Sequence, residues 1–249
     1  MSQVSIKNLW KSYGDQTVLE NISLEIEEGT FISLVGPSGC GKSTMLRMLL
    51  GEESPSKGEI LIDGAPLAPE PSADRGVVFQ RYSVFPHLTV FDNVMLGLEF
   101  AGSPFLSRLF GQKKKAARAR SQSVLDAVGL GQACRKYPSE LSGGMQQRLA
   151  IAQALVKKPK VLLLDEPFGA LDPGIRAEVH EILLSLWKET HMTVFMVTHD
   201  LSEAFKLGTR VIAFDRARNR PEERKVYGAT ITFDHKVERK LAPLHAQSA

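Results

Sequence analysis

Cysteine and long apolar runs are the features that this sequence most clearly lacks. Only two cysteines, Cys40 and Cys134, occur in 249 residues, so a disulfide framework is excluded and a reducing cytosol is favoured. The best apolar runs, residues 161–164 and 193–197, have the length of buried strands and fall short of the roughly 18 apolar residues of a membrane-spanning helix. The first ten residues lack the basic region and apolar core of a secretion signal. We therefore expect a cytosolic protein that does not cross a bilayer by itself.

A strong excess of charge is also missing. Lys and Arg number 31 and Asp and Glu number 28, so the formal net charge is only +3, and no nucleic-acid partner is expected from it. The six histidines show no metal-ligand spacing with the cysteines, so we expect no metal site built by the protein alone. The 43% hydrophobic and 24% charged residues are typical of a folded globular chain with room for one large or two small domains.

Strands and helices alternate along most of the chain. Strands are predicted within residues 4–26 and at 31–35, 59–62, 77–79, 161–164, 193–197 and 210–214. Helical patterning dominates from about residue 91 to 155, and further helices are predicted at 44–50, at 173–189 and from 202. This alternation predicts a parallel sheet with crossover helices. In the polar tail from residue 216, the segment 226–233 is expected to form a hairpin or an added strand.

A basic cluster lies in the segment 102–122. Its members are Lys113, Lys114, Lys115, Arg118 and Arg120. One interpretation is an ordinary solvated helix face or loop. The other is attraction to anionic lipid headgroups, which contributes about 1 kcal/mol per basic residue near a membrane surface.

A glycine-rich loop follows the predicted strand 31–35. It reads Gly36, Pro37, Ser38, Gly39, Cys40, Gly41, Lys42 and Ser43, with Thr44 opening the next helix, and it matches the phosphate-loop pattern in its expected strand-to-helix context. The glycines allow backbone N–H groups to turn toward phosphates, and the helix start adds partial positive charge. We expect Lys42 to reach the β- and γ-phosphates and the Ser43 hydroxyl to bind Mg²⁺.

Two carboxylates end the apolar strand 161–164. With a phosphate loop upstream, Asp165 is the residue expected to hold Mg²⁺ from a second strand. Glu166 would then lie at the strand tip, near the γ-phosphate, where it can orient and deprotonate the attacking water.

A second glycine-rich loop opens the helix that is expected from about residue 145 to 156. Ser142, Gly143 and Gly144, together with the helix N-terminus, make another anion site. One ATP does not need two such cradles from one subunit. The natural solution is a head-to-tail dimer, in which each ATP contacts the phosphate loop of one chain and this loop of the other.

At this point the sequence resembles an ATP-binding cassette (ABC) ATPase. Ser142–Gly144 is similar to the signature loop of that family, and Met145 stands where the commonest signature has Gln. The resemblance adds four residues: Gln80 as the glutamine that senses Mg²⁺ and the attacking water, Asp172 in the loop that crosses the dimer interface, His199 as the switch histidine on the γ-phosphate, and Tyr13 as the aromatic ring on adenine.

The resemblance implies a fold as well as a site. The expected fold is an α/β P-loop NTPase with a mixed, mainly parallel sheet, an N-terminal antiparallel β subdomain and an inserted helical subdomain at about 84–156. The cassette would span residues 4–215, and residues 216–249 would form a C-terminal extension.

The same resemblance implies partners. They are a second copy of the chain or a homologous cassette, separate integral membrane permease subunits and an extracytoplasmic solute-binding protein, with the chain at the cytoplasmic face of a bacterial plasma membrane. Residues 168–172 and 186–190 resemble cassettes of nitrate, sulfonate, taurine and bicarbonate importers. The cassette does not touch the solute, so the solute is not encoded here.

Two other functions are alternatives to transport. A non-transport cassette of DNA repair or chromosome structure would separate the phosphate loop from the acidic strand by long coiled coils, and a translation cassette would occur twice in one chain. A small-molecule kinase would need an acceptor pocket and would not need Ser142–Gly144.

Overall fold

Two sheets and a group of helices make up the computed structural model, which describes residues 3–68, 70, 72–80, 84–102, 109–216, 218 and 223–237. The smaller sheet has the antiparallel order β2-β1-β4-β5 and the larger one the order β10-β9-β3-β8-β7-β6. The smaller sheet consists of β1 (Val4–Tyr13), β2 (Gln16–Ile26), β4 (Lys57–Ile62) and β5 (Ala65–Pro66). The larger sheet consists of β3 (Phe31–Val35), β6 (Arg75–Val78), β7 (Val161–Asp165), β8 (Thr193–Val197), β9 (Arg210–Asp215) and β10 (Thr230–Lys236).

The larger sheet is parallel except at one edge. All residues of β3 and β8 are buried, and so are the first four of β7; continuous apolar strands of this kind are covered on both faces. Only β10 runs antiparallel to its neighbour, β9. The predicted fold class, with its mixed sheet and its N-terminal antiparallel sheet, is therefore confirmed.

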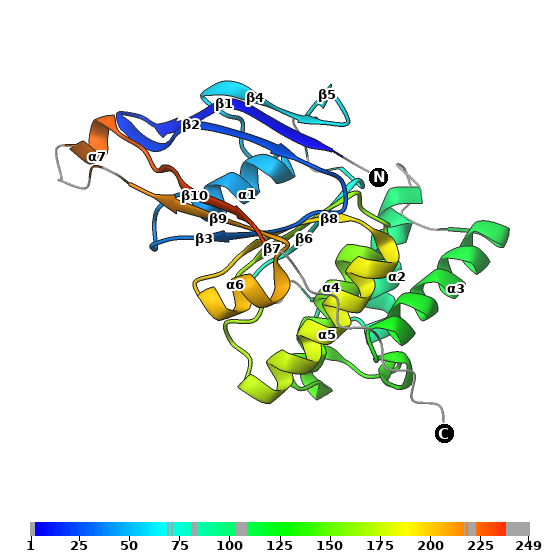
Figure 1. Cartoon of the computed structure of the whole chain (residues 1–249). Coiled ribbons are helices and arrows are strands. Elements are labelled where there is room, and N and C mark those ends of the chain that lie inside the picture. Colours follow the sequence, from blue (N-terminus) through cyan, green and yellow to red (C-terminus); the bar gives the residue numbers. More distant parts are fainter. Residues whose placement is uncertain are drawn as a thin grey trace.

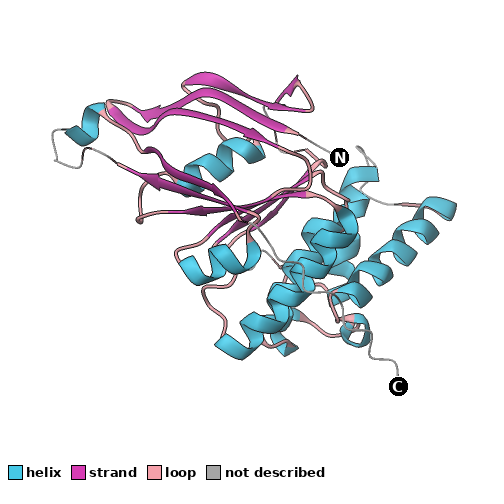
Figure 2. Ribbon diagram, in the orientation of Figure 1, coloured by secondary structure: helices cyan, strands magenta, loops and turns pink. Residues whose placement is uncertain are grey.

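Helices cover both faces of the larger sheet (Figures 1 and 2). Helix α1 lies between the two sheets, and α4 and α5 lie on the opposite face with α2 and α3 beside them. The helices are α1 (Lys42–Leu50), α2 (Val90–Gly102), α3 (Gly111–Ala127), α4 (Gly143–Leu155), α5 (Pro173–Thr190), α6 (Leu201–Leu207), α7 (Glu223–Val226) and the short 3-10 turns η1 (Gly131–Ala133) and η2 (Pro138–Glu140). Each face of the sheet contributes to a separate apolar core, one around α1 and one around α4 and α5.

The register of the central strands decides where their ends lie. Leu34 of β3 and Asp165 of β7 are both paired with Val197 of β8. The residues that follow these three positions therefore leave the sheet at one level and at one edge. In open α/β sheets this carboxyl edge is where ligands bind.

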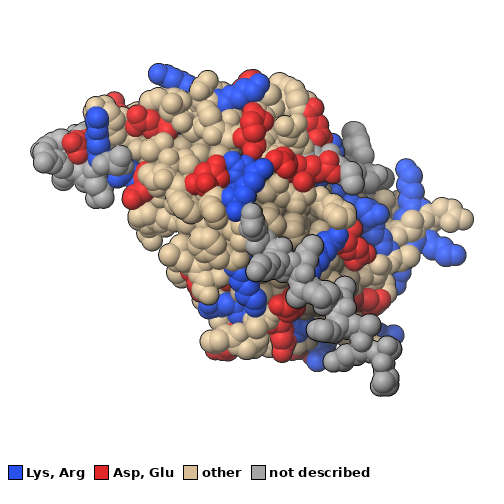
Figure 3. Space-filling model, viewed as in Figure 1, with Lys and Arg blue, Asp and Glu red and all other residues tan. Residues whose placement is uncertain are grey.

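Three regions differ from the expectation or refine it. Helix α4 begins at Gly143, two residues earlier than predicted. In the tail, residues 223–226 form a short helix, and the added strand spans residues 230–236. The prediction of an added strand in the tail is therefore confirmed, and the strand begins and ends later than the predicted 226–233. The basic cluster lies on α3, where Lys113–Lys115 and Arg118 are exposed and basic side chains project into solvent (Figure 3).

Two expected absences can be compared with the structure. Cys40 and Cys134 are both free thiols. Within the described ranges, no helix is long and apolar enough to cross a membrane.

Candidate functional site

The loop between β3 and α1 has the backbone that its glycines predict. Gly36, Gly39 and Gly41 all have positive φ, with values of 146°, 78° and 96°. A Cβ on Gly36 would lie 2.1 Å from the carbonyl oxygen of Phe214, so no other residue fits there. Pro37, Ser38 and Gly39 are exposed, which leaves the outer rim of the loop open to a ligand.

Lys42 lies beneath this loop. Its Nζ donates hydrogen bonds to the carbonyl oxygens of Gly36, at 2.7 Å, and Pro37, at 2.9 Å, and lies 3.8 Å from the buried Cys40 sulfur. The ammonium group is thus already centred in the loop. A phosphate bound there would offer it charged acceptors, which make stronger hydrogen bonds than carbonyls.

Ser43 and Asp165 meet beside the start of α1. The Ser43 hydroxyl donates to Asp165 Oδ1 at 3.1 Å. Burial raises the pKa of Asp165 above its ordinary value, and the charge of Glu166 adds to this, while the Ser43 hydrogen bond, Arg47 and Lys42 oppose it. One hydroxyl and one carboxylate next to a phosphate site suit Mg²⁺, which prefers oxygen ligands and is commonly held by one or two carboxylates plus substrate phosphates.

Glu166 is the centre of a polar cluster. Gln80 Nε2 donates to Glu166 Oε2 at 3.4 Å, and His199 Nδ1 lies 3.5 Å from the same oxygen. Glu166 also has a positive φ of 45°, which is unusual outside glycine and is tolerated mainly where the surroundings enforce it, often at active sites. The three residues predicted to be catalytic, Glu166, Gln80 and His199, are therefore brought together by the fold.

Tyr13 lies at the side of the phosphate loop. It is 46% exposed, its hydroxyl donates to Glu53 Oε2, and Lys11 Nζ lies 4.8 Å from the ring centroid. Partial burial and the Glu53 carboxylate raise the pKa of the phenol, and a hydrogen bond with Thr44 lowers it. The contact with Thr44 places the ring next to the start of α1, where an adenine would extend from bound phosphates.

The second glycine-rich loop caps α4. The Ser142 hydroxyl accepts a hydrogen bond from Met145 N at 3.4 Å, and a Cβ on Gly144 would meet the Ile175 side chain at 2.2 Å, so this loop packs against α5. Asp172, the residue before α5, is exposed. The two loops open helices that lie on opposite faces of the larger sheet, α1 and α4 (Figure 1), and in the described part of the chain no hydrogen bond joins Ser142–Gly144 to residues 36–44.

Comparison with known proteins shows the family to which the chain belongs. The model of the ABC transporter family matches residues 19–169, which is more than half of the chain. The chain belongs to the ABC transporter family. The predictions of an ATP-binding cassette and of ATPase activity are thereby confirmed.

Three relatives place this cassette more closely. The aliphatic sulfonates import ATP-binding protein SsuB of Bacillus anthracis is 42% identical over 83% of this chain and 77% of its own length. The spermidine/putrescine import ATP-binding protein PotA of Roseobacter denitrificans is 45% identical over 84% of this chain but only 55% of its own length, so the chain spans about half of that relative. The dimeric post-hydrolysis structure of the cassette MJ0796, bound to ADP and Pi, superposes with a TM-score of 0.74 at 32% identity and covers 95% of this chain and 99% of its own.

Sequence reasoning missed several residues that hold the cassette's site together. Arg176 pairs with Asp200 at 3.6 Å, and Glu203 and Thr198 share a buried hydrogen bond of 2.6 Å. The available signal was position: Thr198 and Asp200 flank His199, and Glu203 lies in the first turn of the helix that follows.

The raised pKa of Asp165 generates a stability prediction for the nucleotide-free cassette. Because burial disfavours the ionised carboxylate in the folded state, Asp165→Asn should raise the Tm at neutral pH. The gain should shrink as the pH falls through the raised pKa of folded Asp165 toward the ordinary aspartate range, and it should vanish below that range, since the carboxyl is then protonated in both the folded and the unfolded state. Thermal unfolding from about pH 3 to pH 8 measures it.

Asp15→Asn is the matched control, because Asp15 is exposed. Its effect on the Tm should be small at every pH. A lower Tm for Asp165→Asn than for the wild type at neutral pH would contradict the explanation by burial.

Proposed function

We propose that this chain is the ATP-hydrolysing subunit of a bacterial importer, working as a head-to-tail dimer on separate membrane permease subunits. The observation that carries the proposal is the convergence of Gln80 and His199 on Glu166, one residue beyond the Asp165–Ser43 pair. The importer assignment is supported by relatives named as import ATP-binding proteins.

ATP would lie across the carboxyl edge of the larger sheet. The backbone of Gly36–Thr44 would hold the phosphates, with Lys42 exchanging its carbonyl contacts for phosphate oxygens, and Tyr13 would stack on adenine. Mg²⁺, when bound, would neutralise phosphate charge; Ser43 and Asp165 would hold it, and Gln80 would complete its oxygen ligands.

Glu166 would take a proton from the attacking water as general base. Gln80 and His199 already lie within 3.5 Å of its Oε2. Gln80 would orient the water, and His199 would contact the γ-phosphate oxygens. Positioning and electrostatic stabilisation of this kind supply most of the rate enhancement in phosphoryl transfer.

A second copy would complete the site. Ser142, Gly143 and the N-terminus of α4 would face the γ-phosphate held by the partner, and the exposed Asp172 would lie at the interface. The separation of the two anion sites within one chain favours this arrangement, and the related cassette MJ0796 is itself dimeric. A heterodimer with a homologous cassette would satisfy the same geometry.

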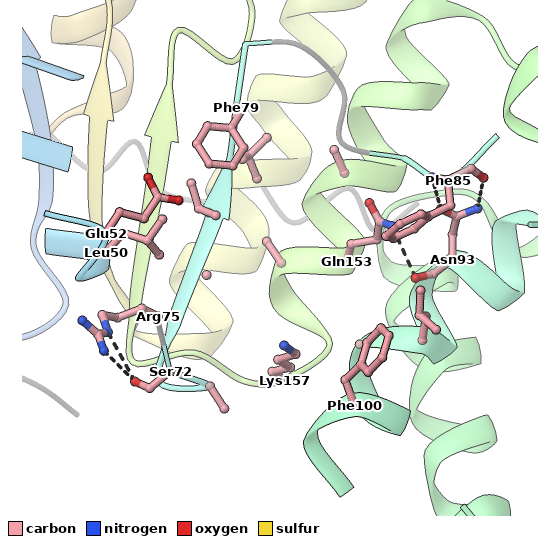
Figure 4. Close-up of a pocket in the computed structure, with 18 residues that line it drawn as sticks. Leu50, Glu52, Ser72, Arg75, Phe79, Phe85, Asn93, Phe100, Gln153 and Lys157 are labelled. Carbon is pink, nitrogen blue, oxygen red and sulfur yellow. Dashed lines mark hydrogen bonds between the residues drawn. The ribbon is translucent and has the colours of Figure 1, made fainter. Parts of the chain in front are cut away.

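The permease would dock in a pocket of about 500 Å³ between β6 and the helices α2 and α4. Phe79 lies on one side of it and Phe85 and Phe100 on the other (Figure 4); Phe85 is 42% and Phe100 58% exposed. Asn93 fixes the Phe85 segment, because it bonds both the N–H and the carbonyl of Phe85 and accepts from Gln153 of α4. The groove is mainly apolar, and Phe79, which lines it, directly precedes Gln80 in the chain. Such a groove suits an amphipathic helix of a permease.

The solute would be selected elsewhere. Relatives at 42% and 45% identity are named for solutes as different as sulfonates and polyamines. The cassette would therefore couple ATP hydrolysis to transport without selecting the solute. Selection would belong to the permease and to an extracytoplasmic solute-binding protein, with this chain at the cytoplasmic face.

In the same proposal, residues 84–156 are the helical coupling subdomain inserted in a cassette of residues 4–215.

Glu166→Gln tests the catalytic assignment. The variant should bind ATP, hydrolyse it at least ~100-fold more slowly because the general base is lost, and accumulate as a dimer in ATP. Steady-state phosphate release and size-exclusion chromatography measure the two effects. The exposed Glu28→Gln is the control, and wild-type turnover in Glu166→Gln would refute the role of Glu166.

Mixing two inactive variants tests the head-to-tail dimer. Lys42→Ala should lose ATP binding in its own phosphate loop, and Ser142→Arg should block the γ-phosphate of the partner. A mixed dimer places both defects in one site and leaves the other intact, so an equimolar mixture should recover roughly a quarter of wild-type turnover if the sites are independent. No recovery, with both variants folded, would contradict the shared site.

Phe100→Glu tests the docking pocket. A buried charge at a helix–groove contact should reduce the fraction of the protein that sediments with membranes of the source organism several-fold, and turnover of the isolated cassette should stay unchanged. Phe233→Glu, at an exposed phenylalanine of β10, is the control. Equal sedimentation of both variants would place the permease contact elsewhere.

A further inference from the structure

A buried chain of hydrogen bonds runs behind His199. His180 Nε2 of α5 lies 3.0 Å from Glu203 Oε1 of α6, and the Thr198 hydroxyl donates to Glu203 Oε2 at 2.6 Å. The residues His180, Glu203 and Thr198 are only 4%, 7% and 2% exposed. None of them has a part in the proposed mechanism, yet they join two helices to the end of β8.

The Thr198 hydroxyl fixes the backbone on both sides of His199. It donates to Glu203 and also accepts a hydrogen bond from Asp200 N at 3.1 Å. Asp200 in turn caps α6, where its Oδ1 accepts from Glu203 N at 3.2 Å. His199 is the single residue between Thr198 and Asp200, so its Cα is held by neighbours that are tied to the same glutamate.

His199 has little else to hold it. Its side chain is 67% exposed, and its contact with the Glu166 carboxylate is 3.5 Å long. An exposed side chain with one weak contact samples several rotamers. Its mean position is therefore set by the backbone that carries it.

The same chain reaches the loop that follows Glu166. The His180 ring packs edge-on against Phe168, with ring centroids 4.5 Å apart, and Phe168 is two residues beyond Glu166. One turn earlier on α5, Arg176 pairs with Asp200 and donates to the carbonyl of Leu171, beside Asp172. Helix α5 therefore contacts the segments on both sides of the proposed water site.

We propose that His180, Glu203 and Thr198 are positioning residues, which hold His199 and the Glu166 loop in their reactive arrangement. This inference rests on the proposed role of His199. A purely structural role fits the chemistry less well, because a buried polar network is often no more stabilising than apolar packing of the same volume. Supporting contacts of this kind keep a reacting group within the few tenths of an ångström that catalysis requires.

Two pairs of variants separate positioning from stability. Thr198→Val removes the bridging hydroxyl, and Thr193→Val removes a buried hydroxyl at the other end of β8, where it accepts from Gly29 N. His180→Leu removes the donor to Glu203, and His180→Gln retains an N–H near the position of Nε2. Steady-state hydrolysis gives kcat and KM for ATP, thermal unfolding gives the Tm, and the ¹H–¹³C imidazole resonance of His199 reports its position without turnover.

Thr198→Val and His180→Leu should lower kcat about ten-fold, which corresponds to ~1.4 kcal/mol in the barrier, with KM changed less than about two-fold. Both should shift or broaden the His199 resonance. Thr193→Val and His180→Gln should keep kcat within about two-fold of the wild type, even where the Tm falls.

Loss of Tm alone, with kcat and the His199 resonance unchanged in Thr198→Val and His180→Leu, would overturn the proposal. His199→Ala separates the two levels of inference. If it hydrolyses ATP at the wild-type rate, the proposed role of His199 fails, and the resonance still decides whether the buried chain positions the ring.

Discussion

The parallel register of β3, β7 and β8 is the constraint on which the rest of the site depends. Because Leu34 and Asp165 are both level with Val197, the chain leaves the sheet at one edge with the phosphate loop, Glu166 and the Thr198–His199 segment side by side. No functional side chain has to reach far from its strand. The two apolar cores on either face of the sheet maintain this register, so burial that never touches a nucleotide still determines the geometry around it.

The residues at this edge are poor choices for stability alone. Asp165 is desolvated by burial, Glu166 has a left-handed backbone, and Lys42 directs its ammonium at the carbonyls of its own loop. In the proposed function, a bound cation would offset the desolvation of Asp165, and bound phosphates would offer Lys42 charged acceptors. A rigid sheet can hold such local strain because the surrounding structure leaves the chain no alternative.

Sequence reasoning reached the strands, the phosphate loop and the acidic strand end because each is a local pattern: an apolar run, a glycine spacing, a carboxylate after a strand. It could not derive the contact between Gln80 and Glu166, which are 86 positions apart, from spacing alone, and it reached Gln80 only through family resemblance. Neither the local patterns nor the family resemblance identified His180. On α5 it occupies the same buried face as Val179 and Leu183, so its pattern is that of a core position, and only the approach of Glu203 from α6 gives it a partner. The predicted start of the added strand in the tail was wrong for a similar reason, because β10 is defined by its pairing with β9 and not by its own alternation.

Helix α5 connects the proposed dimer interface to the residues around His199. Its first residues follow Asp172 and pack against Gly144 of the second anion loop through Ile175. The next residue, Arg176, contacts Asp200 and Leu171, and one turn further on His180 reaches Glu203. A partner that presses on the segment before α5 would therefore act on a helix already bonded to the backbone around His199. Interfaces and packed cores respond to such pressure by moving between discrete arrangements and not by bending gradually. In that case the contacts of α5 would link the partner's loop to the segment around His199, and hydrolysis would await a complete dimer.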